Sequence, residues 1–232
     1  ELIPGTLLCV DQALAQTPID VDALAARAQA YWSVRTVAEA GVGSRLDLAD
    51  DEAVAELDRV LRDAVALRME ADVPLGAFLS GGVDSSLVVA LMQAQSARPV
   101  QTFSIGFHEA EYDEAQHAAA VARHLGTDHH EVYVTAQDAL DVVPKLATMF
   151  DEPFADSSQI PTYLVSRMAR QHVTVSLSGD GGDELFSGYK RYFIGERLWR
   201  SIDCLPMPLR RSLAATLRVA PGLWARLLQV GM

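Results

Sequence analysis

The chain has 232 residues, half of them hydrophobic, and a formal net charge of −12 at pH 7. This length is enough for one large domain or two small ones, and the ordinary charged fraction is typical of a globular protein. The acidic balance argues against a general nucleic-acid binder, which needs a basic face. No apolar run reaches membrane-spanning length and no signal-peptide pattern opens the sequence, so we expect a cytoplasmic protein without membrane contact.

The two cysteines and the charge distribution carry little functional signal. Cys9 and Cys204 lie far apart without metal-ligand spacing, and we expect both to be buried as small hydrophobic residues. Residues 185–232 carry 8 Lys+Arg and 2 Asp+Glu, against 11 and 29 in residues 1–184. We interpret these basic residues as the solvent-exposed faces of arginine-rich helices. The alternative is that some of them bind a triphosphate.

Residues 1–48 are typical of a connector rather than an independent domain. They begin with a short extended piece at Leu2–Leu8, and Gly41–Ser44 marks a loop. A helix is expected to begin at Asp50, because Asp50 and Asp51 suit a helix N-terminus. Apolar residues then recur every three or four positions along one face: Val54, Leu57, Leu61 and Ala64.

The stretch Val73–Met92, VPLGAFLSGGVDSSLVVALM, predicts a buried strand, a glycine turn and a helix. Such a turn favours an anion site, because N–H groups converge at a helix N-terminus and the helix dipole attracts negative charge. The glycines let phosphate oxygens approach the backbone amides, and Asp84 can hold Mg²⁺ beside them. The lysine of a Walker A loop and the third glycine of a dinucleotide fingerprint are both absent.

Strands and helices alternate after this motif. The patterns predict strands over residues 100–107, 130–134 and 173–177, and helices over 114–125, 136–150 and 160–171. This order predicts an α/β fold with a parallel sheet covered by helices on both faces. Two or three helices follow towards Met232, and they contain Leu209–Arg211 and Leu223–Trp224.

The predicted strand at 173–177 ends in a second glycine-rich turn, Ser178–Glu184, which reads SGDGGDE. Ligands of open parallel sheets sit beyond the carboxyl ends of the strands. If this strand neighbours the one before Ser80, then Asp84, Asp180 and Asp183 face one crevice. Those acids repel a bare triphosphate but accept a magnesium-bound one. The alternative is that Asp180 or Asp183 simply caps a helix.

The order of five motifs resembles the synthetase domain of the glutamine-dependent asparagine synthetase family. These are SGGVDSS, TFSIGF, LGTDHHEVYVT, DEPFADSSQIPTYLVSRMA and SLSGDGGDELFSGYKRY, and the first is similar to the PP-loop of ATP pyrophosphatases. The resemblance implies a Rossmann-like PP-loop fold, a parallel twisted sheet with helices on both faces and a helical C-terminal extension. It also implies a connector at 1–48 from a missing N-terminal glutaminase domain, a synthetase domain at 49–192, and the start of a truncated helical part at 193–232.

By the same resemblance, ATP and Mg²⁺ serve to adenylate the side-chain carboxylate of aspartate. Pyrophosphate leaves, and ammonia, taken from glutamine in the full-length family, then forms the amide. The resemblance assigns Asp180 and Asp183 to catalysis, and Asp84 and Asp183 to the metal. The residues expected to bind ATP and pyrophosphate are Leu79, Ser80, Gly81, Gly82, Val83, Asp84, Ser85, Ser86, Ile105 and Gly179.

Several alternatives stay open at this point. The family pattern often has Glu where Asp180 stands, and related synthetases act on other carboxylates, including β-lactam-forming ones. A tRNA-modifying PP-loop ligase or a non-catalytic nucleotide-binding fragment are further readings, and we expect this chain alone to bind ATP with little amide synthesis. The sequence also leaves the oligomeric state open, with a homodimer as one of the alternatives. Lys190 and Arg191 could reach a phosphate or be ordinary exposed basic residues. His129 and His130 are adjacent on a strand, so we expect opposite faces, one packed and one exposed.

Overall fold

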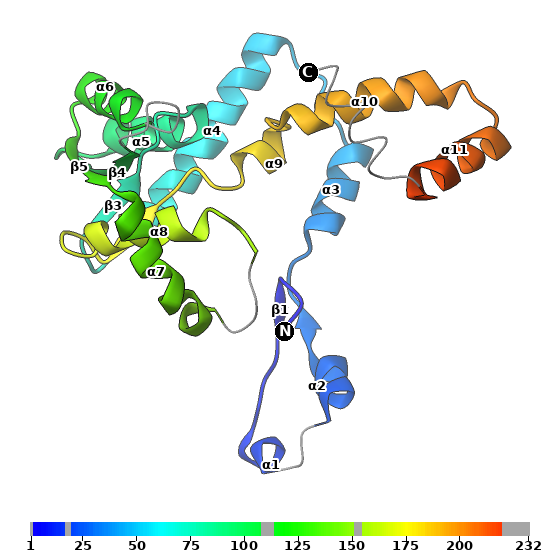
Figure 1. Ribbon diagram of the computed structural model, residues 1–232, viewed down its shortest axis with the longest axis horizontal. Coiled ribbons are helices and arrows are strands. Elements are labelled where there is room, and N and C mark those ends of the chain that lie inside the picture. The colour runs from blue at the N-terminus through cyan, green and yellow to red at the C-terminus, as the bar shows by residue number, and fades with distance from the viewer. Residues whose placement is uncertain (1, 17–19, 108–113, 151–154, 220–232) are drawn as a thin grey trace. The chain divides into compact units, whose positions relative to one another are not determined.

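The computed structural model of the protein describes residues 2–16, 20–107, 114–150 and 155–219. The chain forms two compact units, Glu1–Arg59 and Val60–Met232 (Figure 1). The domain boundaries predicted after residues 48 and 192 stay predictions. Among the described residues, no helix combines the length and the apolar character that a membrane span requires.

The first unit consists of short elements, several of which begin at polar caps. Its strands pair antiparallel, and the side chains of Asp11, Asp20 and Ser33 accept hydrogen bonds from the first turns of its three short helices. In chain order these elements are β1 (Thr6–Leu7), α1 (Gln12–Ala15), α2 (Val21–Arg27), β2 (Gln29–Ala30) and α3 (Val34–Gly43).

Two sequence-based expectations about local structure are wrong. The loop expected at Gly41–Ser44 is the last turn of α3, where the Ser44 N–H donates to the Ala40 carbonyl at 2.9 Å. A glycine inside a helix costs only about 1 kcal/mol relative to alanine, so the capped helix continues through it. Cys9 and Cys204 are both exposed rather than buried. Cys9 follows a strand of only two residues, and Cys204 ends a helix with its thiol donating to the Ser201 carbonyl.

The helix predicted from Asp50 is confirmed as α4 (Asp50–Met69), which continues across the division between the units. The Glu52 carboxylate accepts a hydrogen bond from the Ala49 N–H at 3.2 Å, and this closes the first turn. Towards its end, Leu61 and Val65 pack into the core of the second unit.

The second unit is built on a four-stranded parallel sheet, which confirms the predicted α/β class. The strand order is β5-β4-β3-β6, and every neighbouring pair is parallel. The expected strand ends differ from the observed ones by at most two residues. The strands are β3 (Leu75–Phe78), β4 (Gln101–Phe107), β5 (Asp128–Val134) and β6 (Val175–Leu177).

Helices cover both faces of this sheet, as the alternating pattern predicted (Figure 1). On one face, Ala77 and Leu79 pack with α4, α5 and α6; on the other, Phe78 and Phe103 pack with α8 and Val142 of α7 joins a neighbouring cluster. The helices are α5 (Val83–Gln95), α6 (Ala115–Leu125), α7 (Ala136–Met149) and α8 (Gln159–Ala169).

The topology creates a switch point beside β3. The chain steps outward from β3 to β4 and β5, then crosses back to place β6 on the other side of β3. The crossovers from β3 and towards β6 therefore leave in opposite directions, which opens a crevice at the carboxyl ends of these two strands. The two glycine-rich turns found in the sequence follow β3 and β6, so both lie at this edge.

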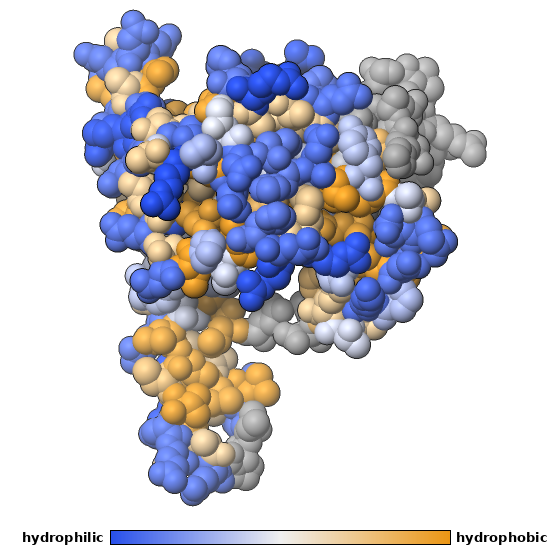
Figure 2. All heavy atoms as spheres, turned by 90° about the vertical axis from the view of Figure 1, so that its left-hand side faces the viewer, coloured by the Kyte–Doolittle hydropathy of each residue, from blue (hydrophilic) through white to orange (hydrophobic). Residues whose placement is uncertain are grey.

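Three helices complete the described part of the second unit: α9 (Gly182–Phe186), α10 (Lys190–Asp203) and α11 (Met207–Val219). Helices were expected here, while Leu223–Trp224 and residues 151–154 of the predicted loop lie outside the described residues. The face that Figure 2 shows is largely hydrophilic, with apolar side chains visible between polar ones.

Candidate functional site

A cleft of about 1120 Å³ opens beyond the carboxyl ends of β3, β4 and β6. Its floor is apolar and comes mainly from β3 and β4, with Phe78, Phe103, Ile105 and Phe107 among its lining residues. Its other walls are the loop after β3, the loop after β6 and the start of α8. A large site with an apolar floor and polar loops at a switch point is the arrangement expected for a cofactor or nucleotide.

The loop after β3 is held in shape by two serine hydroxyls. The Ser80 Oγ lies 2.9 Å from the Ser85 Oγ, the Gly82 N–H donates to Ser80 Oγ at 3.3 Å, and the Ser80 N–H donates to Ser85 Oγ at 3.2 Å. Gly82 is the N-cap of α5 and makes no side-chain cap bond. The first residues of this 13-residue helix, Val83, Asp84 and Ser85, line the cleft, and the N-cap residue makes no side-chain cap bond to their N–H groups, an arrangement that suits an anion.

Gly81 fulfils a packing role in the same loop. Its φ is +82°, a left-handed value that favours glycine, and a Cβ there would lie 2.8 Å from the backbone N of Ala118 in α6. Gly81 therefore lets the loop turn tightly against α6. It does not line the cleft.

The loop after β6 makes a second glycine turn directly against the first. The Gly182 N–H donates to the Gly179 carbonyl at 3.2 Å, and Gly181 has a left-handed φ of +92°. A Cβ on Gly179 would lie 2.6 Å from the backbone N of Ser85, and one on Gly182 would collide with the Asp84 carboxyl group. The two loops are thus in contact, as expected from strand pairing.

The cleft is strongly acidic. Among the described lining residues are six carboxylates and no Lys, Arg or His side chain. Asp84, Asp180 and Asp183 belong to this set, as the sequence predicted, and the remaining members are Glu114, Asp156 and Glu184. The Ser178 hydroxyl donates to the Asp180 carboxylate at 3.0 Å, and the cap of α9 is Gly181 rather than an acid. The alternative that Asp180 or Asp183 serves as a side-chain helix cap therefore fails.

Most of the predicted site residues gather in this one cleft, and two do not. Besides Gly81, the exception is Ser86, whose Oγ is buried without a hydrogen-bond partner in the described residues and borders a small apolar hollow between α5 and α6. The predicted residues that line the cleft are Leu79, Ser80, Gly82, Val83, Asp84, Ser85, Ile105, Gly179, Asp180 and Asp183.

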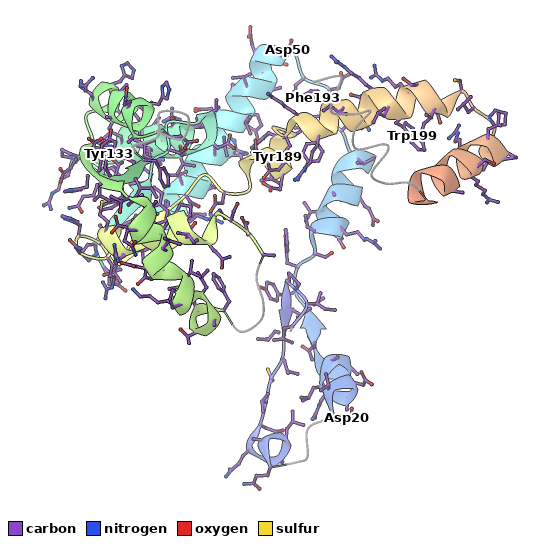
Figure 3. The ribbon with its side chains drawn as sticks, viewed as in Figure 1. Asp20, Asp50, Tyr133, Tyr189, Phe193 and Trp199 are labelled. Atoms are coloured by element: carbon purple, nitrogen blue, oxygen red, sulfur yellow. The ribbon has the colours of Figure 1, made fainter. Side chains whose placement is uncertain are left out.

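Tyr189 and Glu184 are cleft residues that the sequence did not reveal. The Tyr189 hydroxyl donates to the Glu184 carboxylate at 2.7 Å. This hydrogen bond lowers the pKa of Glu184 and raises that of Tyr189. Tyr189 stands at the start of α10 (Figure 3). Its place in the motif GYKRY was visible in the sequence, but nothing local indicated that the chain returns to the cleft there.

The start of α8 supplies a further wall. Asp156 accepts a hydrogen bond from the Ser158 N–H at 2.9 Å, and this bond lowers the pKa of the Asp156 carboxyl group. Asp156, Ser158, Pro161 and Thr162 all line the cleft. The run ADSSQIP showed a helix start in the sequence, and only the crossover from β5 to β6 brings it to this edge.

The adjacent histidines of β5 do point to opposite faces, but the expectation that one is exposed is wrong. His129 Nδ1 lies 2.9 Å from Thr102 Oγ1, and its side chain is only 12% exposed, so burial lowers its pKa. The His130 ring packs against both Phe103 and His172, at centroid distances of 5.3 and 4.1 Å. Neither ring lines the cleft.

The fold and cleft define a parallel α/β protein with a large acidic cleft at two glycine-rich loops. Residues 56–229, most of the chain, match the family model described as asparagine synthase. The chain therefore belongs to the asparagine synthase family, and the resemblance seen in its motifs is confirmed.

Two curated relatives show the extent of this match. A putative glutamine-hydrolyzing asparagine synthetase 2 from Methanocaldococcus jannaschii is 48% identical over 146 residues, covering 62% of this chain and 28% of the relative. The glutamine-hydrolyzing asparagine synthetase 1 of Bacillus subtilis is 37% identical over 173 residues, covering 74% and 27%. The chain thus spans about a quarter of the length of these relatives.

Among solved structures, the NH3-dependent NAD synthetase from Campylobacter jejuni matches with a TM-score of 0.42 and 17% identity, covering 58% of this chain and 60% of that one. At this level of likeness, the fold assignment rests on the sheet topology of the protein itself.

Proposed function

We propose that this chain carries the ATP-binding core of a synthetase that adenylates a carboxylate and then converts it to an amide. The observation that supports this most is the contact between the two strand-end loops, where Gly179 lies against the backbone of Ser85 in one cleft. The relatives are named glutamine-hydrolyzing asparagine synthetases. Accordingly we take aspartate as the acceptor and ammonia, released from glutamine by another part of a longer protein, as the nitrogen source.

In this proposal the loop after β3 holds the β- and γ-phosphates. The uncapped N-terminus of α5 supplies N–H donors and a positive dipole end, and the Ser80 and Ser85 hydroxyls add polar contacts. Leu79, Ile105 and Gly179 border the adenosine, for which the apolar floor offers a surface. Binding energy placed on the phosphates aligns the α-phosphorus with the acceptor carboxylate.

The residues present fit a magnesium ion carried by the nucleotide. The described residues hold no group of three His, Cys, Asp or Glu side chains arranged for a metal. Mg²⁺ bound with ATP needs only one or two protein carboxylates, since phosphate oxygens and waters complete its octahedron. Asp84, whose carboxyl group abuts Gly182, and Asp183, which lines the same cleft, are the proposed ligands. When bound, the ion neutralises charge on the leaving pyrophosphate.

The proposed chemistry has two steps. A carboxylate oxygen attacks the α-phosphorus, and the bond to the bridging oxygen breaks, so pyrophosphate leaves with the electron pair. The nitrogen lone pair of ammonia then attacks the acyl carbon, the carbon–oxygen bond to AMP breaks, and nitrogen loses a proton. Asp180, which lines the cleft beside Gly179, is proposed to position ammonia or accept that proton.

Calorimetric titration of the chain with Mg²⁺ and ATP tests the binding half of this proposal. Asp84→Asn should weaken binding about tenfold or more, because it removes a charged contact to the metal. Asp72→Asn is the matched control, since Asp72 is exposed and precedes β3 at the opposite end of the strand. Failure of the unaltered chain to bind ATP would overturn the assignment.

Release of pyrophosphate tests the acceptor. In the longer protein, pyrophosphate should be released from ATP only when aspartate is added. Release with a different acid instead would indicate a related synthetase that acts on another carboxylate. ATP binding without release under any of these conditions would indicate a non-catalytic nucleotide-binding protein.

A further inference from the structure

The described residues that line the cleft include no Lys, Arg or His side chain. They do include six carboxylates, yet ATP, the acceptor carboxylate and the pyrophosphate product of the proposed reaction all carry negative charge. One magnesium ion and one helix N-terminus offset part of this charge. A side chain with a permanent positive charge at the edge of the cleft would therefore contribute strongly to binding there.

Arg191 occupies such a position. Its guanidinium carbon lies 4.0 Å from the ring centroid of Tyr189, which lines the cleft, and 5.6 Å from that of Tyr192. The two tyrosine rings are 5.7 Å apart and tilted by 53°. Tyr189 is fixed in turn by its hydrogen bond to Glu184. These contacts restrain an otherwise exposed arginine in the first turn of α10, beside the cleft residue Tyr189. Figure 3 labels Tyr189 at the start of this helix.

Stacking leaves the hydrogen-bonding edge of Arg191 available. A guanidinium group that lies over an aromatic ring uses its flat face and keeps its N–H donors in the plane. Among the described residues, no hydrogen bond or ion pair to the Arg191 guanidinium is formed at bonding distance, although its charge lowers the pKa of the nearby Glu184. The planar fork matches a carboxylate or a phosphate, either of which can accept two parallel bonds.

We propose that Arg191 binds an oxyanion of a ligand in the cleft, with the Tyr189 ring as its support. The oxyanion belongs either to the phosphates of ATP or to the carboxylate of the acceptor. This inference rests on the proposed function and adds to it a binding residue outside the two glycine loops. Lys190, the adjacent cation, is exposed and stacks on no described ring, so it takes no part.

Three variants of the same chain separate this role from a general charge effect. Arg191→Gln removes both the charge and the fork, Arg191→Lys keeps the charge alone, and Lys190→Gln removes one charge from the neighbouring position. Both positions are exposed, so thermal unfolding of all three variants should match that of the unaltered chain within about 2 °C. The probes are Mg²⁺ with inorganic pyrophosphate, and aspartate added to the chain saturated with α,β-methylene ATP.

Arg191→Gln should weaken one of these two ligands by about tenfold or more, Arg191→Lys by less, and Lys190→Gln by under twofold. Loss confined to pyrophosphate identifies the phosphates as the bound oxyanion, and loss confined to aspartate identifies the carboxylate. Unchanged binding of both by Arg191→Gln, or equal losses in Arg191→Gln and Lys190→Gln, would overturn the role of Arg191 while leaving the nucleotide site intact. An unaltered chain that binds neither probe would overturn the site itself.

Discussion

Replacing Gly179 with alanine should push apart the two loops that form the cleft. The added Cβ would lie 2.6 Å from the backbone N of Ser85 and 2.8 Å from the backbone C of Asp84. Favourable contacts between such atoms lie near about 3.5–4.0 Å, so the overlap is roughly 1 Å. Both atoms belong to the backbone at the start of α5 and cannot rotate away as a side chain would.

Overpacking of this kind costs about 1–3 kcal/mol in the free energy of unfolding. For a chain of this size, that corresponds to a fall in Tm of roughly 2–12 °C. Thermal unfolding followed by circular dichroism measures this shift, and calorimetry should show weaker binding of Mg²⁺ and ATP, because the first turn of α5 is displaced.

Gly195→Ala in α10 is the matched control. A Cβ at Gly195 meets no atom within 4 Å, and alanine is the better helix former by about 1 kcal/mol, so its Tm should stay equal or rise. If Gly179→Ala unfolded at the same temperature as the unaltered chain and bound ATP equally well, the proposed contact between the loops would be refuted.

Three further predictions concern single interactions. Burial lowers the pKa of His129, so as the pH falls below about 6.5 the unfolded chain binds a proton on this imidazole before the folded chain does, and the free energy of unfolding decreases in that range. Measured by urea unfolding between pH 7.5 and 5.5, the free energy of unfolding should decrease less steeply in His129→Gln than in the unaltered chain. Equal slopes in the two chains would contradict this. Thr135→Ala removes the capping box that Thr135 forms with Asp138 at the start of α7. This change should lower the free energy of unfolding in urea by about 1 kcal/mol and raise the pKa of Asp138 towards its usual value. An unchanged Asp138 pKa in an NMR titration would rule out the hydrogen bond between these two side chains. Tyr189→Phe should raise the pKa of Glu184 in an NMR titration, and an unchanged value would show that the hydroxyl does not donate to that carboxylate.

Local patterns in the sequence were sufficient for the parallel sheet and for the two loops, but not for the short elements of the first unit. Apolar runs and glycine turns marked each strand of the parallel sheet to within two residues, and the loops at Ser80–Ser86 and Ser178–Asp183 were recognisable by their glycines and acids. Their meeting depended on β6 pairing with β3 across a long crossover, which no local pattern encodes. The sequence analysis expected the two loops to share one crevice if these two strands were neighbours, and the pairing of β3 with β6 confirms this.

The remaining site residues could not be predicted because their positions depend on tertiary structure. Tyr189 reaches the cleft only because the short helix α9 turns the chain back. Ser86 shows the opposite case. Its place in the motif suggested a phosphate contact, but a helix turns each residue by about 100° from the last, so Ser86 faces away from the cleft that Ser85 lines.

Hydrogen exchange with and without Mg²⁺ and ATP tests the central claim most directly. The claim is that the loop after β3 and the loop after β6 form one nucleotide site. Peptides covering residues 78–88 and 176–186 should both exchange more slowly when the nucleotide is bound, while peptides from the amino end of β3 should not change. Protection of the first peptide alone, or of neither, would contradict a shared cleft.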